Sequence, residues 1–460
     1  MIYRLQLLAV LCSTTVVAFV HAEEPISYDD DIKPIFRQHC LKCHGEDKQE
    51  SDLNLQTYAA ALKGSGGGAV VVAGRSSKSR LFEAITNPDD DARMPPNKPP
   101  IAKMQIALIQ EWIDTGLRES DSDKSTVESR STEFKPNVNA NAKPINPAMP
   151  KSLPGIVIPE TVRPLPVLAM DASPWAPLVA VSGQEHVRLF HAETEREIGK
   201  LPFPEGVPHV IRFSRDGAVL LVAGGRPVQS GSVVLFDVES GKRLAEIGDE
   251  LDSVLAADIS PDQRLIALGG TGKLVKVYST SDGKLKYRIE KHTDWITSIA
   301  FSPDGRMLAT AGRAGGIHLW DAKGGGIILS LAEHKAAVRA IDWRPDSKFL
   351  ASVAEDGRVI WWDVADGWPT INKANAHPPA RPKGIYGTIP NGVLAARFGS
   401  NGNLATTGRD RVVRLWDPAG NQLKQFKIES ALPISAAISR GGAAIVSGDT
   451  NGEIRFWKSQ

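Results

Sequence analysis

Two cysteines and a histidine close together are the residues best suited to chemistry in this 460-residue chain. Cys40 and Cys43 are separated by two residues, and His44 follows directly. Thiols at this spacing lie on one turn of chain, where both can form thioether bonds to the vinyl groups of a haem while the imidazole ligates its iron. The motif therefore predicts one covalently bound haem c per chain, with His44 as the proximal iron ligand.

Two thiols at this spacing have three other possible uses besides haem attachment. A structural zinc site needs about four Cys or His ligands in two pairs, and the one other nearby candidate, His39, adjoins Cys40. A thioredoxin-like redox pair would precede a helix within a strand-helix-strand pattern, which the surrounding residues do not show. A plain disulfide would leave His44 without a role. Haem attachment uses all three residues of the motif and is the leading interpretation.

The second axial ligand must come from the rest of the N-terminal region. No histidine occurs between residues 45 and 118, so the candidates are Met94 and Met104. Met94 precedes Pro95 and Pro96, in a segment too rich in proline for a helix. A rigid loop suits a thioether that must point inward at a fixed height, whereas Met104 begins an expected helix and is more simply a core or surface residue. We predict Met94 as the distal ligand.

Two segments with helical periodicity enclose these candidates. Residues 28–39 carry Ile32, Ile35 and Phe36 at helical spacing, with three aspartates at the N-terminal end, where the helix dipole favours acids. The second segment has its apolar residues at Ile106, Leu108, Ile109, Trp112, Ile113 and Leu117. We expect the two helices to pack together as the core of a small all-α domain over residues 25–118.

Residues 26–118 resemble the planctomycete-type cytochrome c domain of the large cytochrome c class. The shared motifs are Ile32-Lys33-Pro34-Ile35-Phe36, Cys40-x-x-Cys43-His44, Gly74 with Ser79-x-Leu81, Met94-Pro95-Pro96, and Leu108-x-x-x-Trp112-Ile113-x-x-Gly116. The resemblance implies a class I-like cytochrome c fold. It also implies that Cys40 and Cys43 hold the haem, that His44 is proximal and that Met94 is distal.

The segments on either side of this domain carry different signals. Residues 1–22 have Arg4 near the start, an apolar run and small residues before Glu23, which predicts a cleaved secretory signal peptide. An uncleaved anchor is the alternative, because the run is near the lower length of a spanning helix. We expect export to the periplasm or cell envelope, with no transmembrane segment after cleavage. Residues 119–153 are rich in Ser, Asp, Asn and Pro, and are expected to be a disordered linker.

The remaining residues, 154–460, repeat an aromatic residue at a regular interval. These aromatics are Phe190, Phe236, Tyr278, Trp320, Trp362, Trp416 and Trp457, at separations of 46, 42, 42, 42, 54 and 41 residues. Three of them begin a Trp-Asp pair, and the period is typical of propeller blades with four short strands each. This region resembles the WD-repeat family, which implies an all-β propeller with seven blades.

Three features of the repeats lead to further expectations. His334, Ser352, Asp356 and Trp362 match the family's structural hydrogen-bond set, so His334 and the similarly placed His292 are interpreted as structural. The 54-residue interval is expected to hold an insertion, residues 366–390, that is either a contact site for a partner or the haem domain, or a passive excursion. The strand missing from the last blade is expected from Ile156 to Ile158, beside Ile454 to Trp457.

The charge composition disfavours one class of function, nucleic-acid binding. The formal net charge of +1 implies no basic face for nucleic acid. The leading hypothesis is electron transfer, with no catalytic residues and with the propeller docking a redox protein or complex. The alternatives are a haem-based sensor or scaffold, and an enzyme resembling the cytochrome-propeller nitrite reductases, a class that uses eight blades rather than seven. The oligomeric state and the physiological partner stay open.

Overall fold

The computed structural model describes residues 26–117, 134–137, 140, 142–155, 165–379 and 391–458. The chain divides into two compact units, Met1–Arg130 and Ser131–Gln460. Each unit has its own hydrophobic core, and each is described by itself.

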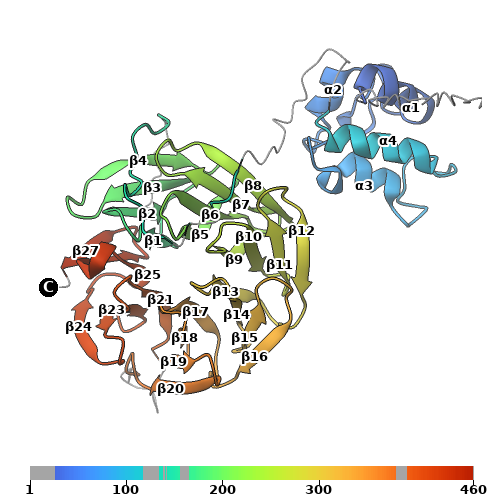
Figure 1. Cartoon of the computed structure of the whole chain (residues 1–460). Coiled ribbons are helices and arrows are strands. Elements are labelled where there is room, and N and C mark those ends of the chain that lie inside the picture. Colours follow the sequence, from blue (N-terminus) through green and yellow to red (C-terminus); the bar gives the residue numbers. More distant parts are fainter. Residues whose placement is uncertain are drawn as a thin grey trace, which may run out of the picture. The chain divides into compact units, whose positions relative to one another are not determined.

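The described part of the first unit is helical (Figure 1). Its helices are the π-helix η1 (Tyr28–Ile32), α1 (Lys33–His39), the 3₁₀ helix η2 (Glu50–Asp52), α2 (Tyr58–Lys63), the 3₁₀ helix η3 (Ser76–Lys78), α3 (Arg80–Thr86) and α4 (Lys103–Asp114). Ser27 caps η1, because its hydroxyl accepts a hydrogen bond from the backbone N–H of Asp30. The first expected helix is thus split into η1 and α1, with Pro34 in the first turn of α1, where its missing N–H costs nothing.

An aromatic cluster joins the two predicted helical segments. The ring of Trp112 on α4 lies 5.8 Å from that of Tyr28 and 6.2 Å from that of Phe36, and all three side chains are fully buried. The Tyr28 hydroxyl donates to the carbonyl of Leu55 at 2.7 Å. The Phe36 contact is edge-on and the Tyr28 contact is tilted, and such aromatic contacts stabilise the core beyond the apolar area that the rings bury. The expected packing of the two segments is confirmed.

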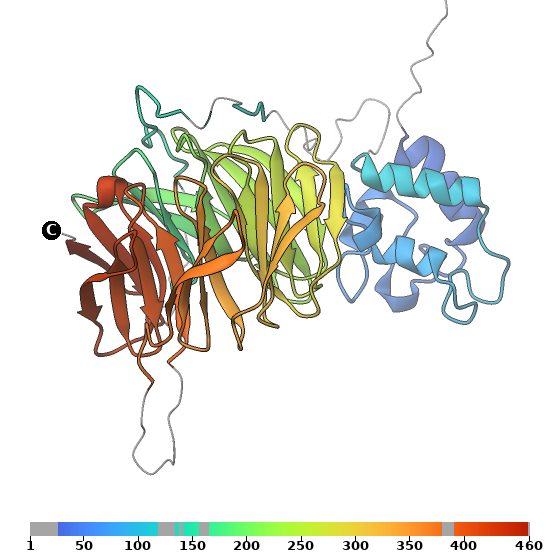
Figure 2. The same cartoon turned by 60° about the horizontal axis from the view of Figure 1, so that its bottom comes forward.

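The second unit is a propeller of seven antiparallel sheets arranged in a ring (Figures 1 and 2). From the innermost strand outward, the blades are β1 (Met170–Ala172), β2 (Leu178–Ser182), β3 (His186–His191), β4 (Glu197–Pro202); β5 (Val207–Phe213), β6 (Val219–Arg226), β7 (Ser230–Asp237), β8 (Arg243–Glu250); β9 (Val254–Ile259), β10 (Leu265–Gly270), β11 (Val275–Ser279), β12 (Leu285–Ile289); β13 (Ile296–Phe301), β14 (Met307–Gly312), β15 (Ile317–Asp321), β16 (Ile327–Leu331); β17 (Val338–Trp343), β18 (Phe349–Ala354), β19 (Val359–Asp363), β20 (Trp368–Lys373); β21 (Val393–Phe398), β22 (Leu404–Gly408), β23 (Val412–Trp416), β24 (Gln422–Lys427); and β25 (Pro433–Ile438), β26 (Ala444–Asp449), β27 (Ile454–Lys458). A 3₁₀ turn, η4 (Arg440–Gly442), joins β25 to β26. The innermost strands of neighbouring blades are in contact all around the ring, including β25 with β1. The predicted seven-bladed architecture is confirmed.

The repeated aromatic residue has the same place in every blade. All seven lie in the third strand of their blades, β3, β7, β11, β15, β19, β23 and β27. Trp362, for example, is 1% exposed and packs with Leu350 and Val364 in one of the propeller cores. The sequence period therefore reports the third strand of each blade.

Closure of the ring involves residues just before β1. The last blade, β25 to β27, has three strands among the described residues, whereas each of the other blades has four. The backbone N–H of Val167 donates to the carbonyl of Asp449 at 3.0 Å, and the hydroxyl of Ser435 donates to the carbonyl of Val167 at 2.7 Å. The predicted closing strand, residues 156–158, lies outside the described residues.

The expectation that residues 119–153 form a linker without packing is wrong for its described C-terminal part. Phe134 is 5% exposed and belongs to a propeller core, and Ala148 belongs to another. The side-chain amide of Asn137 donates to Asp216 at 2.9 Å, and the backbone N–H of Lys151 donates to the carbonyl of Glu239 at 2.8 Å. These contacts form because the folded propeller offers apolar hollows and free acceptors that the polar segment alone cannot provide.

The expected insertion at residues 366–390 is also smaller than predicted. Its first part, Trp368–Lys373, is β20, the outermost strand of its blade. His377 belongs to the hydrogen-bond set of the next blade. The additional length of the interval therefore follows His377, and residues 380–390 lie outside the described residues.

Candidate functional site

The Cys40 to His44 segment continues the chain from α1 as one further helical turn. The N–H of Cys40 donates to the carbonyl of Phe36 at 2.7 Å, and the N–H of His44 donates to the carbonyl of Cys40 at 3.0 Å. Cys40 and Cys43 are both free thiols. The structure thus brings the three predicted residues together on one turn, without a disulfide between the cysteines.

Cys40 sits at the edge of the helical core. It is partly buried and packs against the buried apolar cluster of the first unit. Burial raises the pKa of the Cys40 thiol to about 12. A catalytic dithiol needs a lowered pKa, because the thiolate is the nucleophile. The environment of Cys40 therefore disfavours a thioredoxin-like redox pair.

His44 is held through one of its two ring nitrogens. Its Nδ1 lies 3.1 Å from the carbonyl oxygen of Glu50, which fits an N–H donor at that position. Its Nε2 has no partner among the described residues, so in this tautomer Nε2 carries a free lone pair. Metal-binding histidines are commonly oriented by such a hydrogen bond from the second nitrogen. His39, by contrast, contacts Gln105 of α4 through Nε2 at 3.2 Å.

The two candidate methionines occupy different settings. Met94 lies in the loop between α3 and α4, its backbone N–H donates to the carbonyl of Ala84 at 2.9 Å, and its side chain is 40% exposed. Met104 lies in the first turn of α4 and is 79% exposed. Met104 is thus a helix-surface residue, and the distal role of Met94 stays a prediction.

Arg93, next to Met94, was not singled out from the sequence. Its side chain is only 15% exposed and forms an ion pair with Asp90 through one terminal nitrogen. Its Nε is buried and has no hydrogen-bond partner among the described residues. A buried guanidinium N–H without an acceptor is costly, and a carboxylate such as a haem propionate would satisfy it. The residues present therefore fit a haem: two free thiols, an oriented imidazole, a thioether and an unsatisfied cationic donor.

No group of three or more His, Cys, Asp or Glu side chains in the described ranges is arranged to hold a metal ion. None of the helices in these ranges is both long and apolar enough to cross a bilayer.

The histidines of the propeller have a different environment from His44. His334 contacts Asp356 through Nδ1 at 3.1 Å and Ser352 through Nε2 at 2.7 Å, and the indole N–H of Trp362 donates to Ser352 at 2.8 Å. His292 contacts Thr310 at 2.8 Å. The structural interpretation of both histidines is confirmed.

A second complete set was missed because of the long interval before Trp416. His377 contacts Asp410 through Nδ1 at 2.7 Å and Thr406 through Nε2 at 3.1 Å, and the Trp416 indole donates to Thr406 at 2.9 Å. Burial lowers the pKa of His377 and so favours the neutral imidazole, although the neighbouring Asp410 acts in the opposite direction. The signal that could have found it is the order His, Thr, Asp, Trp with the extra residues placed directly after the histidine.

Two family models match the chain, one in each of its two units. Residues 40–98 match the family model for planctomycete cytochrome C. Residues 283–321, 325–363 and 383–417 match the model for the WD domain, G-beta repeat. No curated protein matches the chain. One segment of the chain is thus similar to planctomycete cytochrome C, three segments are similar to WD repeats, and the second unit is a propeller of seven blades.

Proposed function

We propose that this protein is an exported c-type cytochrome that transfers single electrons and uses its propeller as a platform for a redox partner. One observation carries the proposal: two free thiols and an imidazole with a free Nε2 lie on a single helical turn. The match to the planctomycete cytochrome C family over residues 40–98 supports it independently.

Each residue of the site has a defined role in this proposal. A bound haem supplies a reversible one-electron couple at its iron. Cys40 and Cys43 would hold it covalently, and His44, oriented by the carbonyl of Glu50, would supply one iron ligand. Met94 would supply the second ligand, a thioether, which favours the reduced state. The Arg93 guanidinium would donate hydrogen bonds to a propionate. Electron transfer rather than turnover is the activity that this set supports.

The two alternative functions differ in how well the observations support them. The seven blades depart from the eight of the cytochrome-propeller nitrite reductases, so that enzyme class is not favoured. A haem-based sensor is the second candidate, because the 40% exposure of Met94 suits a ligand that a gas could displace. The WD repeats fit a protein-interaction platform in either case.

Attachment is tested on the full chain, expressed with its N-terminal segment in a host that matures c-type cytochromes. A haem stain after denaturing electrophoresis is expected for the parent and for Met104→Ala, the control, and is expected to vanish for the Cys40→Ala, Cys43→Ala double variant. A stain that survives the double change would contradict covalent attachment.

The prediction that Met94 is the distal ligand is tested by comparing alanine variants of the two methionines. Met94→Ala should open the iron to carbon monoxide and lower the reduction potential, whereas Met104→Ala should do neither, because Met104 lies on the surface of α4. Carbon monoxide difference spectra and a redox titration of both variants provide the readout. Ready carbon monoxide binding by the parent would favour the sensor over the electron carrier.

A further inference from the structure

The central channel of the propeller encloses a cavity of about 660 Å³. Its wall is formed mainly by the innermost strands and is about half polar, and its apolar part comes largely from small side chains such as Ala169, Ala256, Ala340 and Ala395. The charged side chains that line it are Arg212, Arg313, Arg339, Arg397 and Glu355. Four guanidinium groups and one carboxylate therefore face a cavity that none of the structural hydrogen-bond sets uses.

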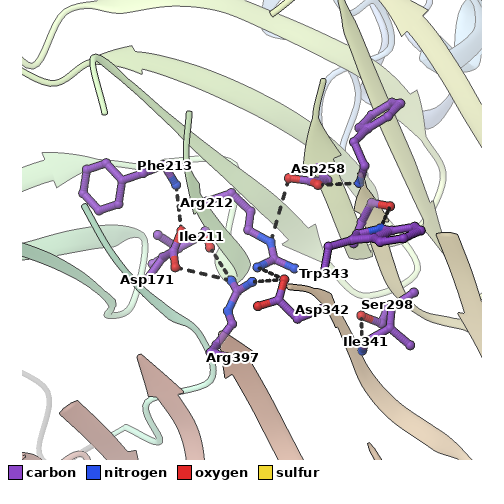
Figure 3. Close-up of polar contacts among 12 residues, drawn as sticks. Asp171, Ile211, Arg212, Phe213, Asp258, Ser298, Ile341, Asp342, Trp343 and Arg397 are labelled. Atoms are coloured by element: carbon purple, nitrogen blue, oxygen red, sulfur yellow. Dashed lines mark hydrogen bonds and ion pairs between the residues drawn. The ribbon is translucent and has the colours of Figure 1, made fainter. Parts of the chain in front are cut away.

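One side chain from each innermost strand forms a ring at the same level of the channel. This channel ring consists of Asp171, Arg212, Asp258, Ala300, Asp342, Arg397 and Ala437. Each stands two residues before the turn that leads to the second strand of its blade. Figure 3 shows the two arginine side chains converging between the three carboxylates.

The carboxylates of the channel ring are turned toward the blades. Each accepts a hydrogen bond from a backbone N–H of the next blade: Asp171 from Phe213 at 2.8 Å, Asp258 from Phe301 at 2.8 Å, and Asp342 from Phe398 at 2.7 Å. None of the three aspartates lines the cavity. They serve as ties between successive blades.

The two arginines, by contrast, have few hydrogen-bond acceptors among the described protein residues. The closest approaches of Arg212 to Asp258 and Asp342 are 3.9 Å, and those of Arg397 to Asp171 and Asp342 are 3.7 and 3.8 Å. These distances exceed a hydrogen bond. A bond of 3.4 Å from Arg397 to the carbonyl of Ile211 is the one hydrogen bond of either guanidinium to the described residues, and the Nε of Arg212 is buried without a partner. Each guanidinium has five N–H donors, so donors that the protein does not pair are left for a ligand in the cavity.

Net charge alone does not select a ligand here. Among the side chains that line the cavity and form the channel ring, the four arginines are matched by Glu355 and three aspartates, and the charge of Arg215 also acts on these aspartates. Burial raises the pKa values of Asp171 and Asp342 to about 6, which favours their neutral forms. The cavity therefore presents hydrogen-bond donors from cationic side chains, and the two oxygens of a carboxylate match the planar donor geometry of a guanidinium.

We propose that this channel binds a small organic carboxylate, whose charged group accepts hydrogen bonds from Arg212 and Arg397 and whose apolar part lies along the alanine-rich wall. The side chains of Arg339 and Trp295, which are 45% and 41% exposed, mark the opposite, open end of the cavity. Arg339 stands three residues before Asp342 on β17, which is roughly 10 Å at the usual rise of a strand. The guanidinium of Arg313 lies 5.0 Å from the ring of the partly exposed Trp295 at this end. An acid of about six carbons fits between the two levels.

The test titrates the full-length protein by calorimetry with hexanoate, and with hexanol and hexylammonium as neutral and cationic probes of equal length. Hexanoate should bind at least about tenfold more tightly than either control, because only the carboxylate accepts charge-assisted hydrogen bonds. A blocked peptide with one glutamate forms a further arm. No binding of hexanoate, tighter binding of hexylammonium, or tighter binding of the peptide would each overturn the proposal, the last by assigning the channel to a partner's side chain.

Variants with opposite expected signs locate the site. Arg212→Gln and Arg397→Gln should each weaken hexanoate at least about tenfold. Asp342→Asn should strengthen it, because Asp342 competes for both arginines, while its amide oxygen still accepts the Phe398 N–H. Arg306→Gln, on a side chain that is 85% exposed, is the matched control and should change nothing. Unchanged affinity in all three channel variants would overturn the proposal. Because no step involves the haem, the result is independent of the function proposed above.

Discussion

Two histidines, one in each unit, differ in how many of their ring nitrogens the protein occupies. His44 uses only Nδ1, against the carbonyl of Glu50, and its Nε2 is left free among the described residues. His334 uses both, with Asp356 on Nδ1 and Ser352 on Nε2. An imidazole with two satisfied nitrogens has no lone pair for a metal, whereas one held through Nδ1 alone is oriented and available. The residue type alone therefore does not tell whether a histidine is structural or can bind a metal. That depends on whether its second ring nitrogen already has a partner in the protein.

The same contrast extends to the surroundings of each residue. The Cys40 to His44 turn occurs once and lies at the edge of its core, where a ligand can reach it. The propeller set occurs complete in two blades, around His334 and around His377, and is buried. A single, partly exposed set suits a reactive site, and repeated buried sets suit structural support.

The largest expected effects come from exchanging each histidine for alanine. His44→Ala should abolish the low-spin haem spectrum but leave the unfolding of the propeller unchanged. His334→Ala should leave the spectrum unchanged and lower the free energy of unfolding of the propeller by about 2–3 kcal/mol, because Asp356 and Ser352 lose their buried partner. Absorption spectra and urea unfolding followed by tryptophan fluorescence measure both. A spectral change in His334→Ala would remove the contrast.

A smaller effect is expected when the serine that accepts a hydrogen bond from the blade tryptophan is changed to alanine. Two blades are compared, one in which this serine also contacts a histidine and one in which it does not. Ser352→Ala deprives both Trp362 and His334 of a buried partner, so about 2 kcal/mol of stability should be lost. Ser447→Ala breaks only the bond from the Trp457 indole, which is worth about 1 kcal/mol. Urea midpoints of the two variants give the comparison. Equal losses would show that the histidine adds nothing to the set.

The smallest expected effect is on the pH dependence of propeller stability, and it comes from Asp342 of the channel ring. Burial raises the pKa of Asp342 to about 6, against the opposing charges of Arg212 and Arg215, with Asp171, Asp258 and Arg397 also facing it. The folded state thus binds the proton more readily than the unfolded chain. This contribution to stability is complete below about pH 4, the pKa of an unfolded aspartate, and is lost as the pH rises through about 6.

Asp342→Asn removes that titration. The decrease in propeller stability between pH 4 and 6.5 should be shallower in Asp342→Asn than in the parent, as measured by urea unfolding across that range. The exposed Asp366→Asn is the control and should keep the parental slope. An unchanged slope in Asp342→Asn would mean that the carboxylate stays ionised in the folded ring.

Local spacing made much of the molecule predictable. The Cys40 to His44 turn and the third-strand aromatics follow from short, regular patterns, and so does the set around His334. What depended on tertiary structure was missed. Phe134 is one aromatic in a polar segment, and its burial requires a hollow on the folded propeller. The set around His377 was hidden because the extra residues separate it from Trp416.

The channel ring was beyond sequence reasoning for a related reason. Its members are about 40 residues apart along the chain, and only the closed ring brings Arg212 near Asp342 and Arg397 near Asp171. Likewise, the buried Nε of Arg93 is visible only once the loop before α4 is folded.

Intact and peptide mass spectrometry of the denatured, exported chain tests the central claim most directly. The account predicts that the peptide containing Cys40 and Cys43 carries the added mass of one haem, and that the Cys40→Ala, Cys43→Ala chain carries none. An unmodified peptide, or one lighter by the two hydrogens of a disulfide, in a chain matured under the same conditions as a control c-type cytochrome, would contradict it.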